Sequence, residues 1–190
     1  MDKFDNNDLQ AKLLEHIING THEEFLKEID SQNNGVSNND FKINLKFENK
    51  SNNPDPEYAK IGDSGFDIRA NIEEPIILGP LDRYLIPTGL FFELPECFEL
   101  QVRPRSGLAA KNGVTVLNTP GTVDDQYRGE VKIILVNLSN VNFTVNHGDR
   151  IAQGILANVS GQRLVNLMKV DTINKDTDRA DGGFGSTGTK

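Results

Sequence analysis

Apolar and polar residues alternate in short stretches along most of the chain from residue 41 onward. In the first of these, Phe41, Ile43, Leu45 and Phe47 alternate with polar residues, which is the pattern of a strand with one buried face. The stretches are separated by short loops that carry Gly, Pro, Asn or Asp, and no long helical pattern lies among them. We expect strands at 41–47, 65–70, 84–94, 98–103, 114–117, 131–137, 141–145, 151–159 and 163–170. Many short strands of this kind indicate an all-β sandwich or barrel-like fold.

The first forty residues have helical periodicity instead. Apolar residues recur there at the spacing of an amphipathic helix, at Leu9, Leu13, Leu14, Ile17 and Ile18. Gly20 follows as a C-terminal stop, and Thr21 with Glu24 forms a capping box ahead of a second short apolar stripe. Isolated helices of this length are only marginally stable, so we expect both to dock on the domain or on a partner.

Two further segments differ in composition from the strand-rich region. Residues 31–40, SQNNGVSNND, are polar and turn-rich, which indicates a linker. The last twenty residues are charged and then glycine-rich, which is typical of a flexible terminus. We therefore divide the chain into a helical N-terminal extension and linker over 1–40, an all-β domain over 41–170, and a flexible C-terminal segment over 171–190.

The charge distribution favours a small phosphorylated ligand over a polymer. The net charge of −8 argues against general nucleic-acid binding. Five basic residues nevertheless gather in the central third of the chain, near glycine-rich turns: Arg103, Arg105, Arg128, Lys132 and Arg150. Focused arginines in an acidic protein suit phosphate groups.

Other compositional features exclude several classes of protein. The single cysteine, Cys97, excludes an internal disulfide and a cysteine-rich zinc site. The sequence has neither a membrane-spanning apolar run nor a signal-peptide profile at its start, so we expect a cytoplasmic protein. In the tail, Gly183 and Gly188 have the glycine spacing of a P-loop, but Thr189 stands where that motif needs lysine.

Five stretches in order resemble the five motifs of the trimeric dUTPases. They read SGFDIRA at 64–70, RPRSGLA at 103–109, GVTVLNTPGTVDDQYRGEV at 113–131, GDRIAQ at 148–153 and RADGGFGSTG at 179–188. The resemblance implies a distorted antiparallel jelly roll that forms a homotrimer and hydrolyses dUTP to dUMP and pyrophosphate. In this family the second and fourth motifs of one subunit, the third of a neighbour and the C-terminal motif of the remaining subunit form each site.

The third motif carries the residues that act on the nucleoside. Its strand ends around the turn at 119–121 indicate a hairpin, with Asp124 just past it. Resemblance assigns Asp124 as the base that orients and deprotonates the attacking water. Neighbouring side chains of a strand point to opposite faces, so only one of Asp124 and Asp125 can face the ligand, and the motif favours Asp124. By the same resemblance four residues bind uracil and deoxyribose: Asn118, Thr122, Val123 and Tyr127.

The remaining motifs are assigned to the phosphates and to closure of the site. By resemblance the phosphate donors are Arg105, Ser106, Gly107, Lys132 and Gln153. Asp67 and Arg103 support the site without touching substrate. In the tail, Phe184 would stack on uracil and Arg179 would reach the γ-phosphate. Gly185, Ser186 and Thr187 would close over the nucleotide as a lid.

Mg²⁺ is the implied cofactor, and we expect the substrate phosphates and water to hold it, without a direct protein ligand. Two positions depart from the family pattern: Gln126 replaces a frequent acidic residue, and Ala180 replaces a frequent glycine. Two alternatives stay open, a dCTP deaminase of the same fold and a regulatory binding protein on a dUTPase scaffold. The combination of Asp124 and Tyr127 favours hydrolysis over deamination.

Overall fold

The computed structural model describes residues 43–159 and 165–182, together with positions 12, 15, 16, 19–21, 24 and 27. The chain divides into two units, Met1–Val159 and Ser160–Lys190. Within residues 43–159, ten strands and one short helix follow one another: β1 (Lys46–Asn49), β2 (Phe66–Arg69), β3 (Ile76–Leu78), β4 (Arg83–Glu93), β5 (Phe98–Arg103), α3 (Ser106–Asn112), β6 (Val114–Val116), β7 (Gly121–Val123), β8 (Val131–Asn137), β9 (Phe143–Val145) and β10 (Arg150–Asn158).

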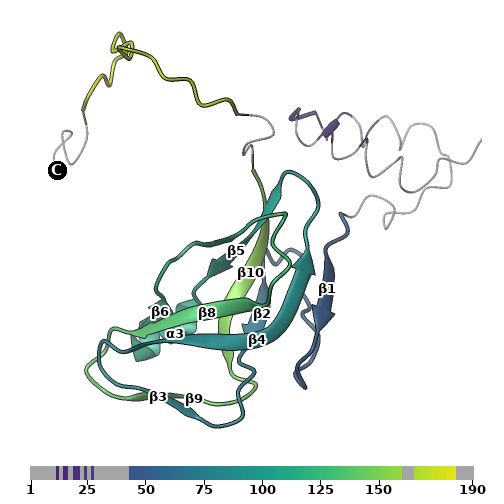
Figure 1. Cartoon of the computed structure of the whole chain (residues 1–190), viewed down its shortest axis with the longest axis vertical. Coiled ribbons are helices and arrows are strands. Elements are labelled where there is room, and N and C mark those ends of the chain that lie inside the picture. The colour runs from purple at the N-terminus through teal and green to yellow at the C-terminus, as the bar shows by residue number, and fades with distance from the viewer. Residues whose placement is uncertain are drawn as a thin grey trace, which may run out of the picture. The chain divides into compact units, whose positions relative to one another are not determined.

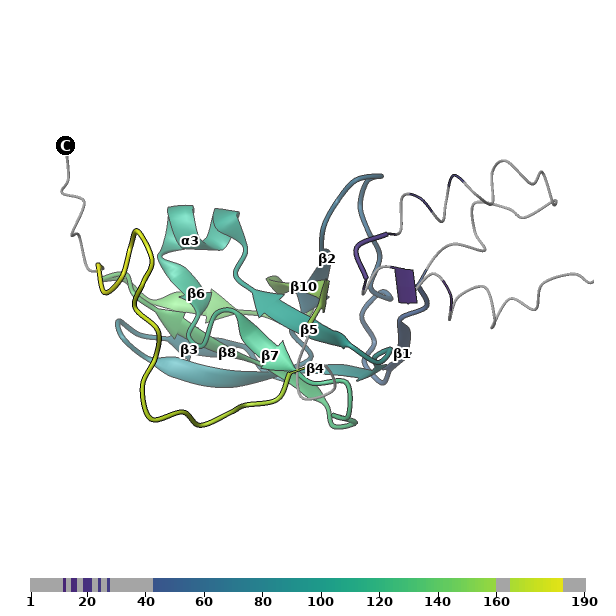
Figure 2. The ribbon, with the colours of Figure 1, turned by 90° about the horizontal axis from the view of Figure 1, so that it is seen from above.

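The strands form two four-stranded sheets and one two-stranded sheet. The strand orders are β1-β4-β8-β6, β2-β10-β5-β7 and β3-β9, and every pair is antiparallel. Figure 1 shows β4 and β8 side by side, with β1 along the other edge of β4. In the view of Figure 2, α3 lies next to β6. This arrangement is a jelly-roll-like all-β fold, as the sequence predicts.

One hydrophobic core lies between the two larger sheets. The strands alternate between buried and less buried positions, as in β5, so each sheet presents one apolar face. Ile68 and Leu100 of one sheet and Ile86 and Ile133 of the other are all fully buried in the same cluster. Their burial fixes the register of the strands, since a slip by one residue would turn these side chains to solvent.

Most of the expected strands are confirmed, with four differences. The first strand begins at Lys46, and residues 43–45 precede it without strand structure. The strand expected at 163–170 is wrong over 165–170, which carry no strand. The sequence did not indicate β3 or the helix α3, and it indicated β7 only as the second side of a hairpin around 119–121.

The two helices predicted within residues 1–40 lie mostly outside the described residues. The described positions 12, 15, 16, 24 and 27 are helical. The division at residues 40 and 170 stays a prediction. No helix among the described residues is long and apolar enough to cross a membrane.

Candidate active site

A cavity of about 300 Å³ brings together five of the residues expected to bind or act on the nucleotide. These residues are Thr122, Val123, Asp124, Tyr127 and Lys132. The opposite wall is formed by apolar side chains of β4 and β8, among them Leu85 and Ile134. The cavity therefore combines an apolar surface suited to a sugar or a base with a carboxylate and an ammonium group.

The hairpin expected before Asp124 is wrong. Val114–Val116 pairs with β8, whereas Gly121–Val123 pairs with β5 in the other large sheet. Residues 117–120 therefore carry the chain from one sheet to the other instead of reversing it within one sheet. The prediction failed because adjacent strands in sequence usually pair, and nothing local in these residues reveals that their partners lie elsewhere.

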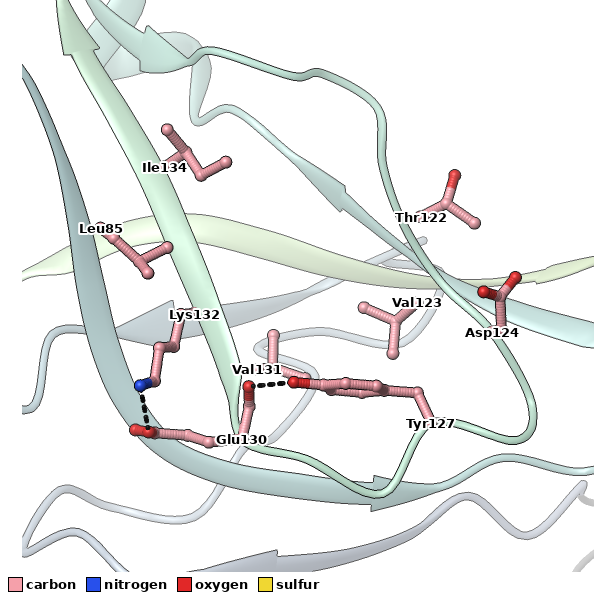
Figure 3. A pocket seen from close by; sticks show the side chains of 9 residues that line it. All are labelled: Leu85, Thr122, Val123, Asp124, Tyr127, Glu130, Val131, Lys132 and Ile134. Carbon is pink, nitrogen blue, oxygen red and sulfur yellow. Dashed lines mark hydrogen bonds and ion pairs between the residues drawn. The ribbon is translucent and has the colours of Figure 1, made fainter.

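Asp124 follows β7 directly and is exposed to solvent. Figure 3 shows Val123 pointing toward Val131 and the ring of Tyr127, whereas Thr122 and Asp124 project from the other side of the segment. Among the described residues, no hydrogen bond or ion pair engages the Asp124 carboxylate. Asp124 lines the cavity and Asp125 does not. Asp124 thus offers a carboxylate that is available to accept a proton from water.

The hydroxyl end of the Tyr127 ring lies against the backbone of residues 129 and 130. Its hydroxyl donates a hydrogen bond to the backbone carbonyl of Glu130, at 3.0 Å. The ring lies so close to Gly129 that a Cβ atom added there would be 2.5 Å from Cζ of the tyrosine. Any larger residue at position 129 would displace the ring. Glycine is therefore needed here for close approach.

Lys132 and Glu130 form an ion pair beside this ring. Lys132 Nζ lies 3.4 Å from Glu130 Oε2, and Figure 3 shows the pair at the edge of the cavity. The other carboxylate oxygen accepts hydrogen bonds from the backbone N–H groups of Thr88 (3.1 Å) and Gly89 (2.9 Å). Lys132 thus lies in the cavity of Asp124 and apart from the other predicted phosphate donors.

A second cavity, of about 370 Å³, contains residues of the first, second and fourth motifs. Asp67, Arg103 and Gln153 line it. Gln153 lies opposite both Asp67 and Arg103 in the sheet, because β10 runs between β2 and β5. Its side-chain amide donates to the carbonyl of Pro104 at 2.9 Å, which ties β10 to the start of the Arg-Ser-Gly turn.

Asp67 joins two arginines at this second cavity. Its Oδ1 lies 2.8 Å from Arg105 Nε, and its Oδ2 lies 3.1 Å from Arg150 Nη1. These contacts agree with the supporting role expected for Asp67. Arg103 instead donates to the side chain of Gln101, on its own strand, at 2.9 Å from Nε. Arg150 lies within the GDRIAQ stretch and among the focused arginines, but it was not predicted as part of the site.

The turn at 105–107 starts the helix α3. Arg105 precedes the helix in extended conformation, and no side chain caps the first turn. The first N–H groups of an α-helix have no partner within the helix, and the first turn of α3 contains no acidic residue. Space around Gly107 is open: apart from its chain neighbours and the backbone of its own helix, no heavy atom would lie within 4 Å of an added Cβ. Ser106 and Gly107, which follow Arg105 in the chain, are exposed.

The two cavities share no lining residue, and they lie toward opposite ends of β5. In the register of β5 with β7, Val102 lies opposite Gly121 and Leu100 lies opposite Val123. Asp124 therefore continues toward the start of β5, whereas Arg103 is at its end. Four residues of extended strand separate these positions, which corresponds to about 13 Å.

Two expected groups of residues lie outside both cavities. Asn118 lines neither, and its side-chain nitrogen lies beside Gly121. In the C-terminal unit, Arg179 Nε donates to the carbonyl of Gly182 at 2.9 Å, within a local turn. Four tail residues lie outside the described part of the chain: Phe184, Gly185, Ser186 and Thr187.

Comparison with known proteins gives consistent results. A dUTPase family model matches residues 51–188. A deoxyuridine 5′-triphosphate nucleotidohydrolase of Finegoldia magna is 51% identical over 146 residues, which are 77% of this chain and 99% of that protein. The protein of the same name from Treponema denticola is 56% identical over 133 residues, covering 70% of this chain and 90% of its own.

Among solved structures, Staphylococcus bacteriophage 80alpha dUTPase with dUpNHpp has a TM-score of 0.68 at 22% identity. The alignment covers 77% of this chain and 99% of that chain, and at this identity it shows a shared fold. The matched residues 51–188 include both cavities and the glycine-rich tail. The chain belongs to the dUTPase family.

Proposed function

We propose that this protein hydrolyses dUTP to dUMP and pyrophosphate, with Asp124 as the general base. One observation carries the proposal: the Asp124 carboxylate lies at the rim of the cavity that contains the Tyr127 ring. A carboxylate free of hydrogen bonds and ion pairs can orient a water molecule and accept its proton. The attack falls on the α-phosphorus, and pyrophosphate leaves.

The proposed location is the cytoplasm.

The residues around Asp124 bind the nucleoside in this proposal. Tyr127 packs under the deoxyribose and leaves no room for a 2′-hydroxyl. Thr122 and Val123 approach the nucleotide largely through their backbone, and Asn118 hydrogen-bonds the uracil edge. Cytosine presents the opposite donor and acceptor pattern, so it would leave polar groups unpaired, at about 1–3 kcal/mol each.

The phosphates bind at the Arg-Ser-Gly turn. Arg105 offers a guanidinium group, Ser106 a hydroxyl, and Gly107 a backbone N–H at the open first turn of α3. Asp67 holds Arg105 in place. Gln153 and Lys132 donate further hydrogen bonds. Phe184 and Arg179 act from the tail, with Gly185, Ser186 and Thr187 closing over the polyphosphate.

Mg²⁺ is the proposed cofactor. The described residues contain no cluster of three or more His, Cys, Asp or Glu side chains that could hold a metal ion. In this proposal the substrate phosphates and water hold the ion, without a direct protein ligand. When bound, the ion neutralises charge on the phosphates.

We further propose that three chains share each site. The support is that Asp124 and Arg103, the residue at the end of β5 that leads into the Arg-Ser-Gly turn, lie toward opposite ends of this strand, about 13 Å apart. The α-phosphorus cannot contact both groups within one chain at that separation. A neighbouring chain that presents its Asp124 to the Arg-Ser-Gly turn would complete the site, and closed rings are the usual result of such head-to-tail contacts.

Replacement of the base tests the proposal. Asp124→Asn keeps the shape of the side chain but removes its basicity, so kcat for dUTP should fall by about 10²–10⁴-fold while nucleotide binding persists. Asp125→Asn is the matched control and should retain most of the turnover. Pyrophosphate release and isothermal calorimetry with a non-hydrolysable dUTP analogue measure the two effects.

Two results would contradict the assignment. Turnover unchanged by Asp124→Asn would show that another group activates water. Release of ammonia from dCTP, with no pyrophosphate from dUTP, would instead identify a deaminase of the same fold.

A further inference from the structure

Glu130, in the cavity that contains Asp124, contacts Lys132, Tyr127 and strand β4, and the proposed function gives it no role. Its side chain is 22% exposed, lines the edge of this cavity, and accepts hydrogen bonds from the backbone of the neighbouring strand β4. We infer that Glu130 is a positioning residue that fixes the Tyr127 ring and so determines discrimination against the 2′-hydroxyl of a ribonucleotide. The inference rests on the proposed function, because it assumes that Tyr127 lies under the sugar.

The carboxylate of Glu130 holds a bulge in β4. The register between β4 and β8 shifts between Pro87 and Leu90, and Gly89 within the bulge has a φ of 70°. The N–H groups of Thr88 and Gly89 therefore leave the ladder, and Glu130 Oε1 accepts both. Buried N–H groups need such acceptors, and hydrogen bonds to a carboxylate are stronger than those to a neutral group.

Thr88 makes the same connection from the other direction. It is 1% exposed, and its hydroxyl donates to the carbonyl of Val131, the residue after Glu130. The same hydroxyl accepts the N–H of Leu90 at 3.1 Å. The bulge and the start of β8 are thus joined by both a carboxylate and a buried hydroxyl, which fixes the backbone at 130 and 131.

The backbone carbonyl of Glu130 is the acceptor for the Tyr127 hydroxyl. Gly129 lies at the same end of the ring, where an added Cβ would be 2.5 Å from Cζ. The position of the ring therefore depends on the backbone at 129 and 130, which the Glu130 side chain anchors to β4. Loss of that anchor would let the carbonyl and the ring move together and open space at the sugar.

The ion pair with Lys132 is a separate interaction of the same carboxylate. It uses Oε2, at 3.4 Å, and Lys132 is 44% exposed. Exposed ion pairs contribute little to rigidity, so the anchor and the ion pair can be separated by substitution. Glutamine at position 130 keeps an oxygen that accepts the two N–H groups of the bulge but has no charge for Lys132.

The test compares dUTP with UTP as substrates of the intact protein. The readout is the ratio of kcat/KM for the two nucleotides, which a general loss of stability or of active protein does not change. Glu130→Ala should lower this ratio by about tenfold, because one misplaced contact in a fitted pocket typically has an effect of this size. Glu130→Gln should keep the ratio within about threefold of the parent value.

Two more variants locate the effect. Lys132→Met removes the ion pair and the proposed phosphate donor but leaves both hydrogen bonds of Glu130 to the bulge, so it should lower kcat/KM for both nucleotides in proportion, with the ratio kept. Gly129→Ala displaces the ring while every contact of the Glu130 carboxylate stays available, so it should lower the ratio as Glu130→Ala does. This variant also supplies the test should Glu130→Ala fail to fold.

The possible results separate failure of the positioning role of Glu130 from failure of the proposed dUTP hydrolysis. An unchanged ratio in Glu130→Ala and Gly129→Ala, in a protein that hydrolyses dUTP, would overturn the positioning role. A lower ratio in Lys132→Met alone would move the role to the ion pair and also overturn it. A parent protein that does not hydrolyse dUTP would overturn the proposed function itself.

Discussion

At the scale of single residues, Asp67 is engaged through both of its carboxylate oxygens. One contacts Arg105 and the other contacts Arg150, so a single side chain joins the second, first and fourth motifs. The side chain is about one-third exposed, which allows the charges to interact more strongly than a fully solvated pair. Asp67 thus orients the guanidinium that we propose to bind phosphate.

Substitution of Asp67 should therefore act through Arg105. Asp67→Asn removes the charge, weakens both arginine contacts and should lower kcat/KM for dUTP by about tenfold, mainly through KM. Asp82→Asn, at an exposed turn before β4, is the control and should leave kcat/KM unchanged. Steady-state kinetics measure both variants. An effect on kcat alone would argue for a direct role of Asp67 in the chemical step.

The residues of the third motif show how far sequence alone could predict the site. Thr122, Val123, Asp124 and Tyr127 were predicted to act together, and one cavity contains all four. Glu130 and Arg150 were not predicted as part of the site. Their roles depend on strand register and on a bulge in β4, which are properties of paired strands that no short stretch of sequence carries.

At the scale of elements, alternation predicted the strands that bury one face, such as β2 and β5. β3 and β7 have only three residues each, too few for alternation to stand out. The alternation at 41–47 continued into a strand that begins only at Lys46. The apolar residues at 165–170 belong to no strand, which shows that composition without a pairing partner does not make a sheet.

Two positions, 89 and 107, differ in how strictly they require glycine. Gly89 has a positive φ, and an added Cβ would meet backbone N and Cβ of Ser51 at 2.8 Å. Gly89→Ala should therefore destabilise the fold by about 2 kcal/mol or more, which lowers the melting temperature by several degrees. Gly107→Ala, in the first turn of α3 with open space around it, should keep or raise thermal stability.

Differential scanning calorimetry of the two glycine variants gives the comparison. Equal melting temperatures would show that the β4 bulge can relax without its glycine. In that case the anchoring of the bulge by Glu130 would also lose its structural basis.

At the scale of the whole molecule, the N-terminal extension is the part that the minimal family pattern lacks. The family match begins at residue 51, and the extension has the helical spacing of a docking element. We predict that deletion of residues 1–40 leaves assembly and dUTP hydrolysis intact. Analytical ultracentrifugation and a pyrophosphate-release assay on the truncated chain test this prediction. Loss of assembly would place the helices in the core of the oligomer.

Shared sites make a second prediction for the assembled protein. Asp124→Asn and Arg105→Ala chains should each be inactive alone, yet in a mixed trimer one of the three sites receives both intact residues. Random co-assembly of equal amounts should restore about one quarter of the parent activity, since about three quarters of the rings are mixed. Co-refolding followed by a hydrolysis assay measures this recovery. A mixture without activity would indicate that each chain holds a complete site.

The separation of Asp124 from the Arg-Ser-Gly turn along β5 has a consequence for kinetics. In a separate chain, Asp124 and the Arg-Ser-Gly turn could not act on the same nucleotide. Such a chain would be folded but would not hydrolyse dUTP. Near the concentration at which rings come apart, the rate would rise with a kinetic order above one in enzyme. Dilution alone would then abolish hydrolysis, although each separate chain would stay folded.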